Sequence, residues 1–329
     1  MSYRKAAEGT EVTKQTVHNL IKKLSLKNKE IIAEPSEKRV VRTVYIEADE
    51  DHVALQNGKK ANLPLIYVHE GWQTENGRRI LINPFYITGF ETPEELWYST
   101  LDYICKRYDF EQIEDIFIGG DGANWIRKGV TIIPKAKFVL DRFHLVRYLK
   151  RASLGDKDIF QTLLALVREC NWDGLYAVLA SLIKAIEDKK DRKKIKECLR
   201  YLRNNWDGIE NYNKYLDKLY GISAEAHVSH ILADRISSRP RGWSKRCLDT
   251  IGKLRALLAA GISIKEVIIK KLIREEAETG EEKENEKVRR SRGVALKYEN
   301  YFRATMPSLH GPASQLTKAL RSLASIEAI

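Results

Sequence analysis

Three acidic residues, far apart in the sequence, stand where a carboxylate could do chemistry. Asp49 ends an apolar strand-like run, Asp121 follows the apolar run 116–118 and two glycines, and Glu225 begins a helical segment. An acid just beyond a buried strand is costly to desolvate unless it faces a crevice, where open α/β sheets bind ligands. Mg²⁺ prefers carboxylate oxygens, and two such ions roughly 4 Å apart serve phosphoryl transfer. We therefore expect the three acids to hold two Mg²⁺ or Mn²⁺ ions, with Asp49 bridging them.

Each of these acids has a competing interpretation. Asp121 could simply cap the helix that follows it, the usual role of an aspartate in that place. Glu225, in the first turn of a helix, would complement the helix dipole. Asp51 shares the strand face of Asp49 and is a second candidate for the first acid, while Asp141 is a reserve candidate for the second. The local patterns leave these alternatives open.

Residues 43–89 are typical of strands that would position the first acid. Apolar and polar side chains alternate up to the acidic triplet 49–51, where a tight turn would lead into a second strand over 52–56. The almost wholly apolar run 63–69 predicts a third strand. Residues 79–89 would either extend the sheet or form an outer hairpin.

Residues 92–150 alternate between helix and strand. The sequence Thr-Pro-Glu-Glu at 92–95 is a strong helix start, and this helix should run to about residue 108. Short strands at 116–118 and 137–140 each precede a helix. Three antiparallel strands followed by alternating units is the topology of the ribonuclease H-like fold, in which an acid of the first strand and one after the fourth lie side by side. We predict an α/β protein whose ribonuclease H-like mixed sheet occupies 43–150.

The stretch 151–220 switches to helix throughout, with apolar residues at spacings of three and four. We predict an all-helical insertion here, with Trp172 and Trp206 anchoring its packing. A basic cluster at 189–194 is diluted by acids, which favours a solvated helix face. The catalytic core would return over 221–260, and a C-terminal helical region would follow over 261–329.

The returning segment carries the strongest signal for contacts with phosphates. From 235 to 255 there are seven basic residues and one acid, interspersed with serines and a tryptophan. This mixture suits phosphate binding with aromatic support. The predicted DNA-contacting residues here are Arg235, Arg239, Arg241, Lys245 and Arg246.

Residues 1–42 are expected to hold a partial helix-turn-helix and a polar linker. A short helix, a glycine turn and a second helix capped by Thr13 would present a polar face to a DNA groove. The groove-facing residues would be Lys14, Gln15, His18 and Lys22. An ordinary surface helix with a solvated basic face is an equally good interpretation of this segment.

Bulk composition points to a polyanionic partner. The chain of 329 residues has 57 basic and 45 acidic side chains, a formal charge of +12. Its four cysteines lie far apart, which is typical of an intracellular protein without disulfides or a zinc site. No apolar run approaches membrane-spanning length, so we expect a cytoplasmic, nucleoid-associated protein with no membrane partner. No phosphate-binding GxxxxGK[ST] loop and no hydrolase nucleophile elbow is present.

Four stretches of the sequence resemble a known family: 45–56, 118–129, 133–152 and 221–244. The family is the ISLre type of bacterial insertion-sequence transposase, often described only as an uncharacterised protein family and related to the mutator-like DDE transposases. The resemblance is clearest over residues 2–260. It implies a ribonuclease H-like catalytic domain that is interrupted by a helical insertion.

Individual positions also match the family pattern. The resemblance implies that Asp49, Asp121 and Glu225 form the catalytic triad. The mutator-like acid-glycine pair, proline and histidine-containing helix correspond to Asp121-Gly122, Pro134 and His144. Arg235 matches the arginine beyond the family's glutamate.

The resemblance implies a transposase that cuts double-stranded DNA at element ends and joins the freed 3′ hydroxyl to target DNA. Such an enzyme would act as a homo-oligomer on DNA. The alternatives are a metal-dependent nuclease without strand transfer, a DNA-binding regulator or an inactive truncated remnant. The last arises because family members generally have a longer N-terminal region than this chain.

Overall fold

The computed structural model describes residues 12–32, 35–219, 221–222, 224–238, 242–271 and 273–274, together with Glu8. Two units divide the chain, Met1–Ile264 and Lys265–Ile329. The first unit contains the sheet and the acids considered above. The described part of the second unit, 265–271 and 273–274, is helical. None of the described helices combines the length and the apolar composition needed to cross a membrane.

A five-stranded mixed sheet forms the centre of the first unit, with the order β5-β2-β1-β6-β7. Strand β1 is antiparallel to β2, which is antiparallel to β5, whereas β1, β6 and β7 run parallel to one another. The strands are β1 (Thr43–Ala54), β2 (Lys60–His69), β5 (Phe85–Thr88), β6 (Asp115–Gly120) and β7 (Ala136–Leu140). The mixed α/β class predicted from the sequence is therefore observed.

The first hairpin differs from the sequence prediction. Strand β1 runs unbroken through the acidic triplet, and Asp49 pairs with Leu65 of β2. The turn lies instead at 55–59, where Gly58 has a φ of +76° and Lys59 N donates to Asn57 Oδ1 at 3.1 Å. An Asn-Gly pair favours a hairpin turn because both residues tolerate positive φ. The predictions of a turn at 49–51 and of a separate strand over 52–56 were wrong, because this pair places the turn later and residues 49–54 continue β1.

Both alternatives for 79–89 occur, in different parts of the segment. Strands β3 (Trp72–Glu75) and β4 (Arg78–Leu81) form a separate two-stranded hairpin. Strand β5 then joins the main sheet at the outer side of β2. The β3–β4 hairpin is thus inserted in the sequence between β2 and β5, which are neighbours in the main sheet.

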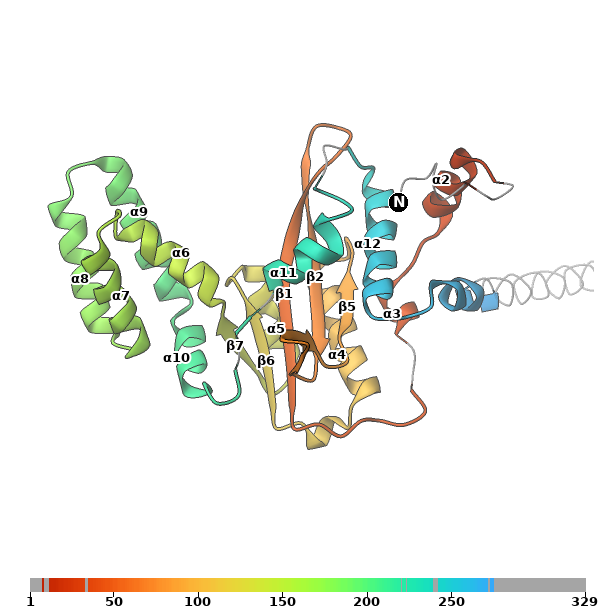
Figure 1. The fold of residues 1–329 in the computed structure, drawn as a ribbon, viewed down its shortest axis with the longest axis horizontal. Coiled ribbons are helices and arrows are strands. Elements are labelled where there is room, and N and C mark those ends of the chain that lie inside the picture. Colours follow the sequence, from red (N-terminus) through yellow and green to blue (C-terminus); the bar gives the residue numbers. More distant parts are fainter. Residues whose placement is uncertain are drawn as a thin grey trace, which may run out of the picture. The chain divides into compact units, whose positions relative to one another are not determined.

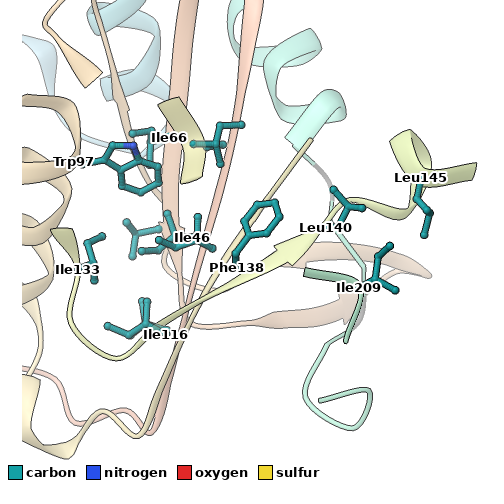
Figure 2. Packing of buried hydrophobic residues seen from close by; sticks show 14 of the residues in the cluster. Ile46, Ile66, Trp97, Ile116, Ile133, Phe138, Leu140, Leu145 and Ile209 are labelled. Carbon is teal, nitrogen blue, oxygen red and sulfur yellow. The ribbon is translucent and has the colours of Figure 1, made fainter. Parts of the chain in front are cut away.

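One face of the sheet is covered by α4 (Pro93–Arg107) and α5 (Asn124–Ile132), with a 3₁₀ turn at Phe110–Gln112 between α4 and β6. Helix α4 begins as predicted, since Thr92 and Glu95 form a capping box with reciprocal hydrogen bonds. Figure 2 shows the core that results, in which Trp97 of α4 packs near Ile46 and Ile66 of the sheet.

The opposite face of β1, β2 and β5 is covered by segments from the other end of the unit. These are α11 (Ala224–Val228), a π-helical turn (Ser229–Ala233) and α12 (Lys245–Ala259). The N-terminal helices α2 (Lys14–Lys23) and α3 (Asn28–Ile31) lie near them, and the buried Lys253 Nζ of α12 donates to the carbonyl of Leu26 at 2.8 Å. Residues separated by more than 200 positions therefore pack together.

The helices expected over 151–220 are present in the described part of that stretch. In Figure 1, α6 to α10 lie on the β7 side of the sheet, and α12, α2 and α3 lie on the β5 side. The rings of Trp172 and Trp206, the two residues expected to anchor the packing of this stretch, meet edge-to-face with their centres 5.0 Å apart. The helices are α6 (Arg142–Ala152), α7 (Lys157–Arg168), α8 (Trp172–Ala185), α9 (Lys189–Asn204) and α10 (Trp206–Lys214).

Candidate functional site

Acids from three parts of the sequence lie at one edge of the sheet, where β6 and β7 end and β1 continues past them. In the parallel register Glu47 of β1 pairs with Gly119 of β6, so Asp49 and Asp121 each lie two residues beyond a paired position. Gly120 pairs with Leu140 of β7, and Asp141 follows directly. This edge is where α/β sheets position ligand-binding residues.

The returning chain reaches the same edge because Gly119 has no side chain. A Cβ at this position would lie 2.8 Å from Cδ1 of Ile222 and 2.9 Å from its Cγ1, closer than packed atoms approach. Ile222 therefore lies directly against the β6 backbone. Three residues later Glu225 occupies the exposed first turn of α11.

The pKa of Asp49 is influenced by both of the other acids of the predicted triad. The pKa of Asp49 is raised to about 6, chiefly by burial and also by the negative charges of Asp121 and Glu225. The backbone N–H of Glu50, which donates to Asp49 Oδ1 at 2.8 Å, and the nearby His144 both lower that pKa. Asp49 is thus a half-buried carboxyl beside two other carboxyls, a pattern enriched at functional sites.

Asp121 has local partners of its own. Its Oδ1 accepts a hydrogen bond from the backbone of Ala123 at 2.8 Å, so the local turn interaction expected of a capping aspartate is present. Its main-chain carbonyl accepts from the hydroxyl of Tyr201 at 2.8 Å. Gly122 follows with a φ of +90°, and a Cβ there would collide with Asn205. Helix α9 and Asn205, the residue that follows α9, therefore hold Asp121 and Gly122 in place.

Asp51, the alternative first acid, and Asp141, the reserve second acid, are both buried and hydrogen-bonded within the fold. Asp51 is 6% exposed and accepts a hydrogen bond from Ser237 Oγ at 2.7 Å. Asp141 is 5% exposed and caps α6 by accepting from Phe143 N at 3.0 Å, with His144 Nε2 3.8 Å from its other oxygen. Burial raises the pKa of both carboxyls.

The donor chemistry of the site suits a hard cation. Asp49, Asp121 and Glu225 offer the oxygen ligands that Mg²⁺ prefers, and the charges of the other two raise the pKa of Asp49. Among the residues that the structure describes, no three His, Cys, Asp or Glu side chains are grouped closely enough to hold a metal ion. The three carboxylates would have to draw closer together to share one, so the two-metal site stays a prediction.

The predicted DNA-contacting residues of α2 differ in their exposure. Thr13 caps the helix as expected, and Lys14, Gln15 and Lys22 are exposed. His18 is half-buried, with Nε2 3.8 Å from Sγ of Cys247 in α12, so its ring is turned partly toward the protein. The first helix expected for the helix-turn-helix lies outside the described residues.

The basic residues of the returning segment are partly engaged by aromatic rings. The guanidinium of Arg235 lies 5.3 Å from the ring centre of Trp243, and Nζ of Lys245 lies 4.9 Å from that of Phe90. Arg246 is exposed. Arg239 and Arg241 lie outside the described residues.

Comparison with known proteins places the chain in a family. The model of the uncharacterised protein family UPF0236 matches residues 1–272. The chain belongs to UPF0236. The UPF0236 protein TTE2489 of Caldanaerobacter subterraneus subsp. tengcongensis is 41% identical over 258 residues, which cover 78% of this chain and 55% of that protein. A UPF0236 protein in the vanSb 3′ region of Streptococcus gallolyticus is 26% identical over 260 residues, covering 74% and 57% respectively.

The chain therefore spans little more than half the length of these UPF0236 relatives.

Among solved structures, the chain is similar to one in the Drosophila P element transposase strand transfer complex, and the match covers 76% of this chain and 73% of that chain. The sequence identity over this match is 13% and the TM-score is 0.27.

In this UPF0236 chain, residues without any sequence signal also border one of the acids, Asp121. A cavity of about 650 Å³ opens beside the Asp121 loop, between that loop and helices α6 and α9. Tyr201 and Asn205 line it, and both contact the Asp121-Gly122 pair. Because these residues lie about 80 positions from Asp121, only the packing of the helical segment reveals them.

Proposed function

We propose that this UPF0236 chain carries the catalytic part of a DDE-type DNA transposase of the ISLre type, built on a ribonuclease H-like core. It would cut double-stranded DNA at element ends and join the freed 3′ hydroxyl to target DNA. The observation that carries the proposal is the electrostatic proximity of Asp49 to Asp121 and Glu225, three acids remote in sequence.

The sheet supports this assignment. Its order β5-β2-β1-β6-β7, with three antiparallel strands followed by two parallel ones, has the arrangement expected of a ribonuclease H-like domain. The first acid lies on the central strand and the second after its parallel neighbour. Helices α7 to α10 lie in the sequence between the second acid and the third, where the helical insertion of such a domain is expected.

We assign Asp49, Asp121 and Glu225 as the ligands of two Mg²⁺ or Mn²⁺ ions. Asp49 is preferred to Asp51 because its carboxylate is influenced by the other two acids, whereas Asp51 is engaged by Ser237. When bound, such ions lower the pKa of an attacking water and stabilise charge on the transferred phosphate. The protein itself must hold the carboxylates ionised and bind the flanking phosphates.

The proposed reaction has two steps. In the first, water attacks a phosphorus atom at the element end, the bond to the 3′ oxygen breaks, and a 3′ hydroxyl is released. In the second, that hydroxyl attacks a phosphorus atom of target DNA and displaces another 3′ oxygen. Basic side chains such as Arg246 and Lys22, both exposed, would bind the DNA backbone. We expect the active species to be a homo-oligomer on DNA.

A nicking assay tests the proposal. Purified protein is incubated with supercoiled plasmid and Mg²⁺ or Mn²⁺, alongside Asp121→Asn and the control Asp217→Asn, an exposed acid outside the site. Nicking that requires metal and Asp121 but not Asp217 is expected, with DNA binding unchanged in both variants. Joining of a labelled 3′ end to a second DNA separates a transposase from a nuclease. DNA binding without any metal-dependent nicking would instead favour a regulator or an inactive remnant.

A further inference from the structure

We infer that the cavity beside the Asp121 loop holds one unstacked nucleotide of the DNA strand, next to the phosphate that is cut. This inference rests on the proposed function, because it names the part of the substrate that the site would take. The cavity of about 650 Å³ lies within the range of about 300 to 1,000 Å³ that is typical of small-ligand sites. Gly122 forms part of its wall, directly after Asp121.

Two tyrosines give the cavity an aromatic wall. The rings of Tyr148 from α6 and Tyr201 from α9 stack with their centres 3.8 Å apart and their planes 12° apart. Both side chains line the cavity. Stacking on aromatic rings is the usual way in which proteins bind an unpaired base, because every base has a flat face.

The lining contains two arginines, and they differ in whether an acid already engages them. Arg127 is held in place by two hydrogen bonds to Asp207, at 2.8 and 3.1 Å. Arg200 is exposed, and within the described part of the chain no ion pair or hydrogen bond engages its guanidinium. The one acid of the lining, Glu197, is paired with Arg151 at 3.2 Å. Arg200 is therefore the cation available to a ligand.

The surroundings favour DNA over a smaller anion. Lys196, Arg200 and Arg203 are exposed at spacings of four and three on α9 and so share one side of the helix. A continuous basic stripe tracks a nucleic-acid backbone and strengthens binding through phosphate contacts. Asn124 and Asn204 add amide groups to the lining, which can hydrogen-bond the edge of a base. Taking a base out of the stack costs free energy, which such a pocket would offset.

A binding assay without divalent cations tests the inference. Two duplexes are compared, one fully paired and one with a single bulged 2-aminopurine nucleotide, whose fluorescence falls when it stacks on an aromatic ring. We expect the bulged duplex to bind at least about fivefold more tightly, the lower end of the effect of one base–aromatic stack, with quenched fluorescence. Arg200→Ala and Tyr148→Ala should each bring the two affinities close together.

Two further variants serve as controls. Arg168→Ala removes an exposed arginine of α7, outside the cavity lining, and should keep the preference. Tyr148→Phe keeps the aromatic ring and should also keep the preference for the bulged duplex. A loss in Tyr148→Ala can then be assigned to stacking, since both variants lack the hydroxyl. Equal affinities for the two duplexes in the unaltered protein, or the same loss in Arg168→Ala, would overturn the inference. So would displacement of the bulged duplex by deoxyadenosine monophosphate as readily as by bulged DNA, since the pocket would then serve a free nucleotide.

The outcome is separable from the fate of the proposed function. Nicking needs metal and Asp121, whereas the bulge preference is measured in chelator and needs neither. If the protein shows no nicking but still prefers the bulged duplex, the proposed transposase activity is rejected and the inference about the cavity stands. If the protein nicks DNA with metal but shows no preference for the bulged duplex, only the inference about the cavity is rejected.

Discussion

The hydroxyl of Tyr201 donates a hydrogen bond of 2.8 Å to the main-chain carbonyl of Asp121, eighty residues earlier in the chain. This bond joins α9 to the loop that presents one of the three acids. Asn205, at the end of the same helix, packs against Gly122. The helical segment between the second and third acids is therefore attached to the candidate site itself.

Tyr201→Phe should impair the site through the position of Asp121. The half-buried carbonyl would lose its donor, and we expect a loss of about 1 kcal/mol in unfolding free energy, the usual size for one such bond. Nicking should fall several-fold, and the Mg²⁺ concentration for half-maximal nicking should rise. The matched control is Tyr176→Phe, a tyrosine of α8 that is 44% exposed. An unchanged metal requirement in Tyr201→Phe would argue against a positioning role.

Asp49→Asn should stabilise the metal-free protein at neutral pH. The folded-state pKa of about 6 exceeds the ordinary value of 3.8, so the folded state binds more protons between these pH values and loses stability as pH rises through them. The asparagine removes that penalty and can still accept from Glu50 N. We expect a gain on the order of 1 to 2 kcal/mol at pH 7, after allowing for partial exposure, and none at pH 4.

Thermal unfolding in chelator at several pH values measures this difference. Asp217→Asn, at an exposed acid, should show little change at any pH. A stability difference for Asp49→Asn that stays constant from pH 4 to pH 7 would show that burial of the charge is not its cause.

Gly119→Ala should displace the chain that leads to Glu225. The added Cβ would meet Ile222 at 2.8 Å, so the side chain and the segment after it must shift. We expect loss of nicking and a destabilisation of about 1 to 3 kcal/mol, the usual cost of overpacking. Ile222→Ala combined with Gly119→Ala should recover much of both, because it restores the space. Additive effects in this double-mutant cycle would mean that the contact is not the cause.

Lys253→Met should be the most destabilising of these changes. Its Nζ is buried, with the residue 3% exposed, and it donates to Leu26 O, to Glu91 at 2.7 Å and to Asp249 at 3.0 Å. Removing the cation leaves two carboxylates and a carbonyl without their donor. A cost of about 3 to 5 kcal/mol is expected, measured by urea unfolding. Lys184→Met, at an exposed lysine of α8, should cost far less.

Local sequence signals predicted the elements wherever short-range chemistry decides them. The capping box of Thr92 and Glu95, the strands around Ile118 and Phe138 and the helices expected over 151–220 occur near the predicted positions. The predictions of a turn at 49–51 and of a separate strand over 52–56 were wrong, because two local signals competed there. The Asn57-Gly58 pair decided the turn, and the acids stayed within the strand because β2 pairs with them.

Most of the strands and helices, and the acids that lie within or just after the strands, could be inferred from residue types and spacing, because hydrophobic periodicity and turn chemistry act over a few residues. The neighbours of those acids could not. The contact of Tyr201 with Asp121, of Ser237 with Asp51 and of Ile222 with Gly119 each joins residues about 80 to 190 positions apart. Such contacts exist only once the whole chain has packed, because no local preference specifies which distant surfaces will meet.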